Sequence, residues 1–287
     1  MEAFLHQVLS GIATGSIYAA IALALVMIFK ATHHVNFAQG ELAMFSTYIA
    51  LLLIKAGIPY WVAFAMTLVF AFAIGVTIER VIMRPFRHAP ALSVVIVFIG
   101  LLIAINGIAG VIFTFSQQPF PSPFSGFGTS YLSPHEVGMI VVTLIMLAVV
   151  FAFFRFTTLG LAMRAAAENP QSSRLVGIRV GWMLALGWGL AGMLGAVAGT
   201  MTAPIVMLDP FLMGPVILYG FAAALLGGID NPWGAPLGGI IFGVFENLAG
   251  AYVVGTQLKQ TLALFVIVTV LAIRPSGLFG RTVVVRV

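Results

Sequence analysis

The sequence contains no cysteine and very little charge. Without cysteine, the chain can form no disulfide, offers no thiol nucleophile and gives no indication of a redox compartment. Charged residues make up 7% of its 287 residues, whereas hydrophobic residues make up 61%. Together with a mean hydropathy of +1.14, this balance excludes a water-soluble globular domain, in which about 25% of residues are charged.

Motifs for nucleotide, metal or nucleophilic chemistry are also missing. A Walker A loop needs Gly-Lys-Ser/Thr to hold phosphates, but the lysines here follow Phe29, Ile54 and Leu258, and there is no HExxH motif. His33 and His34 are adjacent, and adjacent residues do not share a helix face, which argues against a metal site. We therefore expect no catalytic residue, no metal and no cofactor on this chain.

Long runs without charge dominate the sequence instead. About 20 helical residues cross the roughly 30 Å hydrocarbon layer of a bilayer. Barrel strands would alternate polar and apolar residues, whereas these runs are apolar throughout. They predict an all-α fold, a polytopic transmembrane helical bundle. Five runs have at least 18 residues: Val8–Phe29, Trp61–Ile78, Leu92–Phe115, Val137–Phe154 and Trp182–Thr202.

Four shorter apolar runs bring the expected number of membrane segments to about eight or nine: Leu42–Ile54, Gly214–Ile229, Pro236–Val254 and Thr261–Ile273. With nine crossings and the N-terminus outside, eleven of the thirteen lysines and arginines are cytoplasmic, and only Lys55 and Lys259 are outside. Positive charge marks cytoplasmic loops, so we predict an outside N-terminus and a cytoplasmic C-terminus. This placement also explains the pI of about 9.9 without nucleic acid.

Two segments leave alternatives open. Residues 214–245 contain the turn "GGIDNPWGAPLGG" (227–239). The two runs on either side of this turn either cross the membrane fully or enter it and return to the same side. A turn within the membrane would need shielding by protein or a watery cavity, because its backbone is irregular. The external loop 116–136 has four prolines and no lysine or arginine. It is either a docking surface or an ordinary exposed loop. We expect residues 1–287 to form one transmembrane domain.

Four GxxxG spacings predict close helix packing, because missing side chains let backbones approach. They are Gly11/Gly15, Gly195/Gly199, Gly234/Gly238 and Gly239/Gly243.

Residues 155–181, the longest expected cytoplasmic loop, are unusually charged. We expect "GLAMRAAAE" (160–168) to extend the preceding helix. Proline disfavours helical geometry in the residue before it, so Asn169 can cap a new helix over Pro170–Val176, and Gly177 can end it in a left-handed conformation. Two turns are unstable alone in water. The helix is therefore either an interfacial loop with its arginines among lipid headgroups or a knob that fits a cytoplasmic partner.

This loop resembles the coupling region of permease subunits in ABC importers of the branched-chain amino-acid type. That region contains a glycine, "RA", an acidic residue followed by Asn, and "L-x-GI". Here these are Gly160, Arg164-Ala165, Glu168-Asn169 and Leu175-Val176-Gly177-Ile178. Asp230 departs from the family pattern, which usually has "GGIG" where this chain has "GGID". The resemblance covers almost the whole chain through "GSIYAAIALAL" (15–25), "NFAQGE" (36–41), "IERVIMRPFR" (78–87), "LLGGIDNPWGAPLGG" (225–239) and "RPSGLFG" (274–280).

The resemblance implies a multi-pass permease in the bacterial cytoplasmic (inner) membrane that imports branched-chain or related amino acids. It implies a second homologous permease forming a heterodimer, two ATP-binding subunits that carry ATP-Mg, and an external solute-binding protein, with membrane lipid around the helices. The alternative is an ion-coupled secondary transporter or a channel that works without ATPases. The resemblance assigns coupling to Arg164, Ala165, Glu168, Asn169, Pro170, Arg174, Leu175 and Gly177.

Polar residues in or beside the apolar runs are candidates for the translocation path or gate. Glu41 can alternatively cap its helix, and Asn106 can alternatively hydrogen bond between helices. Glu246 either lines the path or ties helices together, because a charge in hydrocarbon must face protein or water. Glu79, Arg80, Arg84 and Arg87 are expected at the inner rim. The path candidates are Asn36, Gln39, Glu41, Asn106, Glu246 and Asn247.

Overall fold

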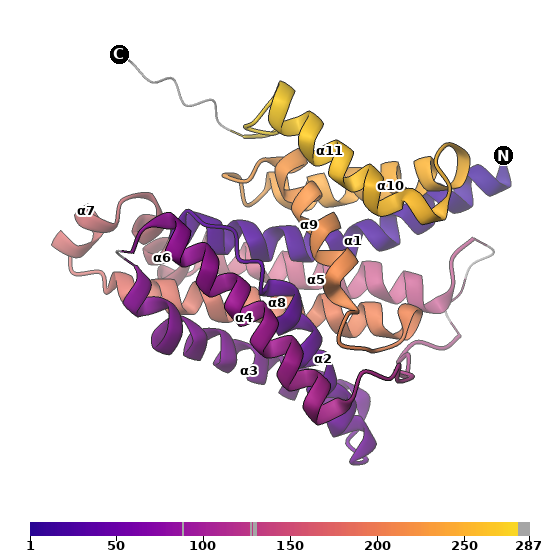
Figure 1. The fold of residues 1–287 in the computed structure, drawn as a ribbon, viewed down its shortest axis with the longest axis horizontal. Coiled ribbons are helices and arrows are strands. Elements are labelled where there is room, and N and C mark those ends of the chain that lie inside the picture. The colour runs from indigo at the N-terminus through magenta and orange to yellow at the C-terminus, as the bar shows by residue number, and fades with distance from the viewer. Residues whose placement is uncertain (88, 127, 129–130, 281–287) are drawn as a thin grey trace. The chain divides into compact units, whose positions relative to one another are not determined.

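The computed structural model describes residues 1–87, 89–126, 128 and 131–280. Within these residues the protein is built from helices and their connections (Figure 1). The described part contains no β-strand, only an isolated antiparallel bridge between Gln118 and Leu208. The predicted all-α class is therefore confirmed. Arg281 and Arg286, which the sequence analysis places in the cytoplasm, lie outside the described residues.

Each of the nine apolar runs forms a helix. The helices are α1 (Glu2–Thr32), α2 (Gln39–Lys55), α3 (Tyr60–Thr77), α4 (Ala91–Phe113), α5 (Pro134–Phe156), α8 (Val180–Val206), α9 (Met213–Gly227), α10 (Gly234–Tyr252) and α11 (Lys259–Ile273). Shorter helical segments lie between them: the π-helical η1 (Ile78–Met83), the 3-10 helices η2 (Arg84–Phe86) and η3 (Thr256–Leu258), and the α-helices α6 (Thr158–Glu168) and α7 (Pro170–Leu175).

Six helical segments of the described chain are long and apolar enough to cross a membrane. They are Glu2–Thr32, Tyr60–Phe86, Ala91–Phe113, Pro134–Phe156, Val180–Val206 and Thr256–Ile273. α2 has 17 residues and α9 has 15, so both are shorter than the roughly 20 residues that span the hydrocarbon core. The protein is therefore a multi-pass membrane protein.

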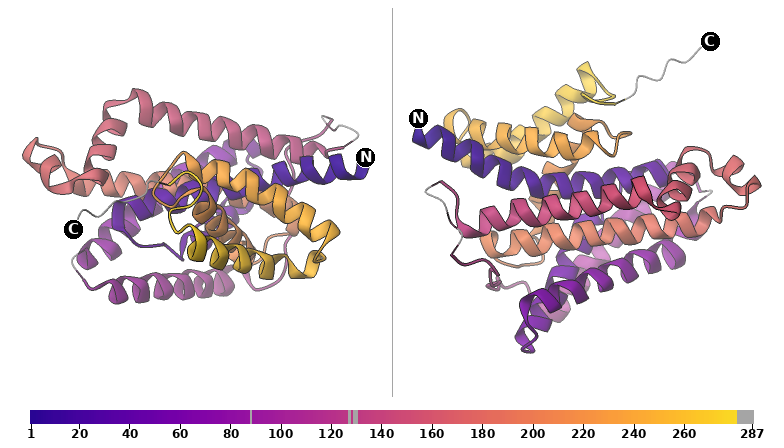
Figure 2. Two further views of the ribbon diagram at one scale, coloured as in Figure 1. Left: turned by 90° about the horizontal axis from the view of Figure 1, so that it is seen from above. Right: turned by 180° about the vertical axis from the view of Figure 1, so that it is seen from behind.

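The chain divides into two compact units. Unit 1 comprises residues 1–26, 124–141 and 215–287, and unit 2 comprises residues 27–123 and 142–214. Within unit 1, α10 and α11 pack side by side (Figure 2). Within unit 2, α8 packs against both α2 and α3.

Glycines on α8 bring its backbone close to α2 in unit 2. A methyl group added at Gly195 would lie 3.2 Å from Cβ of Ala43 and 2.8 Å from Nε2 of Gln39. Gly199 is similarly close to Thr47, one turn further along both helices. Trp188, which is fully buried, packs against Phe98 with ring centroids 6.0 Å apart. Small residues therefore set the helix spacing, and one large aromatic fills the space beside them.

Glycines also set the packing of α1 against α10 in unit 1. A methyl group at Gly15 would lie 2.9 Å from the carbonyl oxygen of Gly239, and Gly243 in turn faces Gly11 and Gly15. Gly238 and Gly234 lie against Gly227 in the same way, between α10 and α9. All four GxxxG spacings therefore lie at close helix contacts, which confirms the predicted tight packing.

The segment after α11 packs on the α9–α10 turn of unit 1. The backbone N–H of Leu278 donates to the Leu226 carbonyl at 2.8 Å, and Asn231 Nδ2 donates to the Phe279 carbonyl at 2.9 Å. Asp230, the departure from the family pattern, is exposed in this turn. Its carboxylate therefore meets solvent rather than the helix contact that the glycines form.

Candidate functional site

The predicted coupling segment, residues 155–181, begins with a corner after α5. Thr157 has extended backbone (φ −103°, ψ 148°), and its side chain accepts a hydrogen bond from the Gly160 N–H at 3.0 Å. Residues 160–168 therefore do not extend the preceding helix, and the prediction that they do is wrong. Thr157 caps a separate helix, α6 (Figure 1). Gly160 lies directly against the backbone of Phe153 and Phe154, so any side chain at this position would clash with the end of α5.

The short helix α7 forms as the sequence predicts. Asn169 is its N-cap, with Oδ1 accepting from the Ser172 N–H at 2.9 Å, and Pro170 is its first residue. Gly177 has a φ of +85°, the left-handed conformation that glycine adopts without a steric cost. The helix ends at Leu175, one residue earlier than predicted.

α6 and α7 differ in how much of their surface they bury. α6 packs against α8 through one face, on which Met163 and Ala166 are buried. Leu175 is 88% exposed and Val176 76% exposed at the end of α7. Of the predicted coupling residues, Ala165 is half-buried and the others, Arg164, Glu168, Asn169, Pro170, Arg174, Leu175 and Gly177, are exposed. The segment therefore presents an apolar tip between arginines.

A charged cluster ties the end of α3 to the start of α8. Glu79 is buried and pairs with Arg87, which also donates to the Gly181 carbonyl at 3.4 Å. The guanidinium of Arg80 lies over the Trp182 ring, 3.6 Å from its centroid, a cation–π contact. The sequence predicted a group of basic residues here, but it did not reveal that two of them contact the start of α8.

Asn36 and Gln39 hold the start of α2. Asn36 Oδ1 accepts from the Ala38 N–H at 3.0 Å, and Gln39 Nε2 donates to the Ala191 carbonyl of α8 at 2.8 Å. Both side chains are fully buried. The Gln39 contact joins α2 to α8. A role for either residue in the translocation path stays a prediction.

Glu41 and Asn106 are brought together between α2 and α4. Asn106 Nδ2 donates to Glu41 Oε2 at 3.1 Å and to the Pro210 carbonyl at 2.7 Å. The alternative that Glu41 caps its own helix is not supported, because no side-chain cap bond is formed at the N-terminus of α2; a path role for Glu41 stays a prediction. The carboxylate instead accepts from the side-chain amide of Asn106 on α4, and the same amide donates to the α8–α9 connection.

Glu246 and Asn247 join three helices of unit 1. Glu246 Oε1 lies 2.8 Å from Lys259 Nζ, and Oε2 accepts from the Tyr18 hydroxyl at 3.4 Å. Lys259 also donates to Asn247 Oδ1 at 3.2 Å, while Asn247 Nδ2 donates to the Gln7 carbonyl at 2.9 Å. The cluster therefore links α1, α10 and α11, and a path role for the pair stays a prediction.

Lys259 and Tyr18 are members of this cluster that sequence reasoning missed. Lys259 was one of two basic residues on the wrong side of the expected charge distribution, and that exception was the available signal. Its alkyl chain packs against Gly250 while its amine neutralises Glu246. A buried carboxylate needs such a partner, so Lys259 has a structural role in unit 1.

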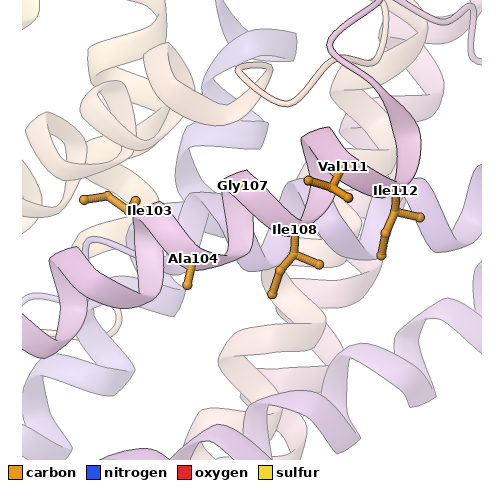
Figure 3. A pocket seen from close by; sticks show the side chains of 6 residues that line it. All are labelled: Ile103, Ala104, Gly107, Ile108, Val111 and Ile112. Carbon is orange, nitrogen blue, oxygen red and sulfur yellow. The ribbon is translucent and has the colours of Figure 1, made fainter.

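α4 carries a shallow hollow of about 410 Å³ on one face (Figure 3). The residues lining it are Ile103, Ala104, Gly107, Ile108, Val111 and Ile112. All of them belong to α4 and all are apolar, so this surface offers no partner for a charged solute. It has the composition of a face that meets lipid or another apolar helix.

The glycine-packed helices of spanning length and the buried polar contacts between them are those of an integral membrane protein. A family model described as "Branched-chain amino acid transport system / permease component" matches residues 7–271. The chain belongs to this family, and the resemblance stated from its sequence motifs is confirmed.

Curated relatives align over nearly the whole chain. The high-affinity branched-chain amino acid transport system permease protein LivH of Escherichia coli K12 is 32% identical, over 99% of this chain and 98% of its own length. The permease protein BraD of Pseudomonas aeruginosa is also 32% identical, with the same coverage. The solved structure titled PsaBC from Streptococcus pneumoniae in complex with Fab has a TM-score of 0.50 and 13% identity, over 93% of this chain and 91% of that one. That structural likeness supports the fold alone.

Proposed function

We propose that this chain is the transmembrane permease subunit of an ATP-driven ABC importer for branched-chain or related amino acids in the bacterial inner membrane. The observation that carries the proposal is the family match over residues 7–271, with relatives of that printed transport function aligned over 99% of the chain. The two compact units act together as one permease domain. A second, homologous permease completes the translocation path as a heterodimer.

Energy enters from outside this polypeptide. Two ATPase subunits bind and hydrolyse ATP-Mg, and an external binding protein delivers the solute. The chain itself carries no cofactor. The tip of α7 supports this division, because Leu175 is 88% exposed on a helix of six residues. So short a helix is not stable in isolation, and an apolar tip of this kind fits a groove on a partner.

Movement of α7 then reaches the helices through the cluster at the start of α8. Arg87 contacts the Gly181 carbonyl, and Arg80 covers Trp182. Because both arginines belong to the segment that ends α3, a displacement of the α7–α8 connection pulls on two helices at once. Closure of the ATPases would in this way switch the permeases between cavities that face out and in.

Nine membrane segments, with the N-terminus outside and the C-terminus cytoplasmic, agree best with the charge distribution. The contact between Leu278 and Leu226 supports this count, because it puts the C-terminal segment and the α9–α10 turn on the same side. α9 is only about 22 Å long. This length is below the roughly 30 Å of the hydrocarbon core, so in this topology one of the two connections that flank α9 lies within the hydrocarbon depth, where irregular backbone is shielded by protein or faces a cavity.

Reconstitution separates this function from the alternative. Liposomes containing this chain, the second permease and both ATPases should accumulate labelled L-leucine only when ATP and the loaded binding protein are supplied. Liposomes containing this chain alone should accumulate none on a proton or sodium gradient. Uphill uptake by the single chain would establish an ion-coupled transporter and overturn the proposal.

A further inference from the structure

Carboxylates within the long helices differ in how their charge is compensated. Glu246 pairs with Lys259, and Glu79 pairs with Arg87. Glu136 accepts hydrogen bonds from Ser10 Oγ, Ser133 Oγ and the Ser133 N–H. Glu41, which is 8% exposed, has one donor, the amide of Asn106. Among the described residues, Glu41 is therefore the buried carboxylate with the least compensation.

Among the described residues, Glu41 forms no ion pair, unlike Glu79 and Glu246. α4 and the α8–α9 connection (207–212) have no lysine, arginine or histidine. The lysine on α2 is Lys55 at its far end, and this side chain donates to Gln118 Oε1 at 2.6 Å. An unpaired carboxylate is costly in hydrocarbon and marks a functional position by default.

The contacts of Asn106 show what kind of group fits beside Glu41. Its single amide nitrogen donates both to Glu41 Oε2 at 3.1 Å and to the Pro210 carbonyl at 2.7 Å. Two acceptors, one charged and one neutral, therefore converge on one nitrogen. The NH2 group of Asn106 has two N–H donors, one for each acceptor. A primary ammonium also has enough donors for both acceptors, and it adds the positive charge that the amide does not supply to Glu41.

A second polar group lies along the same side of α2. Tyr48 follows Glu41 by two helical turns, which puts both on one helix face. Its ring stacks on Phe113 of α4 with centroids 4.3 Å apart, and its buried hydroxyl has no hydrogen-bond partner in the described structure. Buried hydroxyl groups are usually satisfied, so Tyr48 has an unused hydrogen-bonding group on the same helix face as Glu41.

We infer that Glu41 is the counter-charge for the α-ammonium group of the transported amino acid. The Pro210 carbonyl is the second acceptor, and Asn106 holds the two acceptors together while the site is empty. This inference rests on the proposed function and adds the chemical group that the permease recognises. It predicts that the permease itself, and not only the binding protein, selects solutes with a primary ammonium.

Ligand competition tests this selection on the assembled protein. The complex of both permeases and both ATPases is placed in nanodiscs without the binding protein, and labelled L-leucine is the probe. Leucinamide keeps the ammonium and should compete. The isosteric 2-hydroxy-4-methylpentanoate lacks it and should compete about ten- to a hundredfold more weakly, the range expected when a hydrogen bond to a charged group is lost. Equal competition by the hydroxy acid and by leucine would overturn the inference.

Variants of Glu41 identify the residue responsible. Glu41→Gln keeps the shape and the Asn106 contact but removes the charge, so leucine affinity should fall about ten- to a hundredfold and the preference for leucine over the hydroxy acid should disappear. Glu41→Asp should restore part of that preference, which a purely structural role would not explain. The matched control is Glu2→Gln, which removes an exposed carboxylate at the start of α1 and should leave both measurements unchanged.

The outcomes separate the inference from the proposed function. If the wild-type complex takes up leucine with ATP but Glu41→Gln keeps its affinity and preference, the inference is overturned and the function stands. If the wild-type complex neither binds nor imports leucine, both are overturned. Should Glu41→Gln fail to insert, the competition series on the wild-type complex still decides.

Discussion

Two neighbouring segments of unit 2, α7 and α8, are built in opposite ways. α8 presents glycine, alanine and Trp188 to α2, α3 and α4, and most of its central residues are buried. α7 has six residues, of which Ser173 alone is buried, and it ends on a Leu175 side chain that contacts solvent. The sequence of α8 is explained by contacts inside the protein, whereas in α7 only the capping residues are explained in this way and the exposed Leu175 is not. Substitutions should therefore change stability in the first region and coupling in the second.

The largest loss of stability is expected where a buried charge loses its partner. Lys259→Met leaves Glu246 unpaired among α1, α10 and α11, and breaking a buried pair in this way costs about 3–5 kcal/mol. Unfolding by denaturant titration in detergent micelles measures the loss. The double variant Glu246→Gln, Lys259→Met should recover most of it, and an unchanged unfolding midpoint for the single variant would contradict the assigned pair.

A smaller loss is expected where a glycine contact is filled. Gly195→Leu forces α8 away from Ala43 and Gln39, and overpacking of this kind costs about 1–3 kcal/mol. The matched control is Gly100→Leu on the exposed surface of α4, where an added Cβ atom meets nothing within 4 Å. Thermal unfolding of the purified variants should show a lower midpoint for Gly195→Leu only. Equal midpoints would mean that the α2–α8 contact does not contribute as described.

A local loss is expected at the helix cap of the coupling segment. Asn169→Ala removes the acceptor for the Ser172 N–H, which costs about 1 kcal/mol. Because α7 is exposed, the loss should appear as faster amide hydrogen exchange over 170–176 with an unchanged global midpoint. Gln171→Ala, an exposed change in the same helix, serves as the control. Identical exchange in both variants would contradict the capping role of Asn169.

Much of the fold followed from local signals. The nine apolar runs predicted nine helices, and Asn169, Pro170 and Gly177 predicted a separate α7, because hydrophobic length and helix capping depend on neighbouring residues. The corner at Thr157 was missed because the alanine-rich stretch after it reads as a continuing helix. Thr157 and Gly160 were the available signals in the sequence, because threonine caps helices and glycine permits a close backbone approach. In the prediction, the high helix propensity of alanine was given more weight.

The polar sites were predictable as residues but not as pairs. Glu41, Asn106 and Glu246 were singled out because polar side chains are rare in apolar runs. Among their partners, Pro210 and Tyr18 lie far away in the sequence, and Lys259 lies on the following helix. Such contacts depend on how the helices pack, and residue spacing within one helix does not encode that packing. The proposed function came from the family resemblance. The structure shows which carboxylates have a basic partner and which do not.

The most direct test of the account is the ratio of leucine imported to ATP hydrolysed by the reconstituted complex carrying Leu175→Glu. This change at an exposed position should alter folding stability by no more than about 0.5 kcal/mol. In Leu175→Glu, ATP hydrolysis should continue while leucine uptake per ATP falls at least about tenfold. The conservative variant Leu175→Met should keep the wild-type ratio. An unchanged ratio in Leu175→Glu would contradict a coupling role for α7.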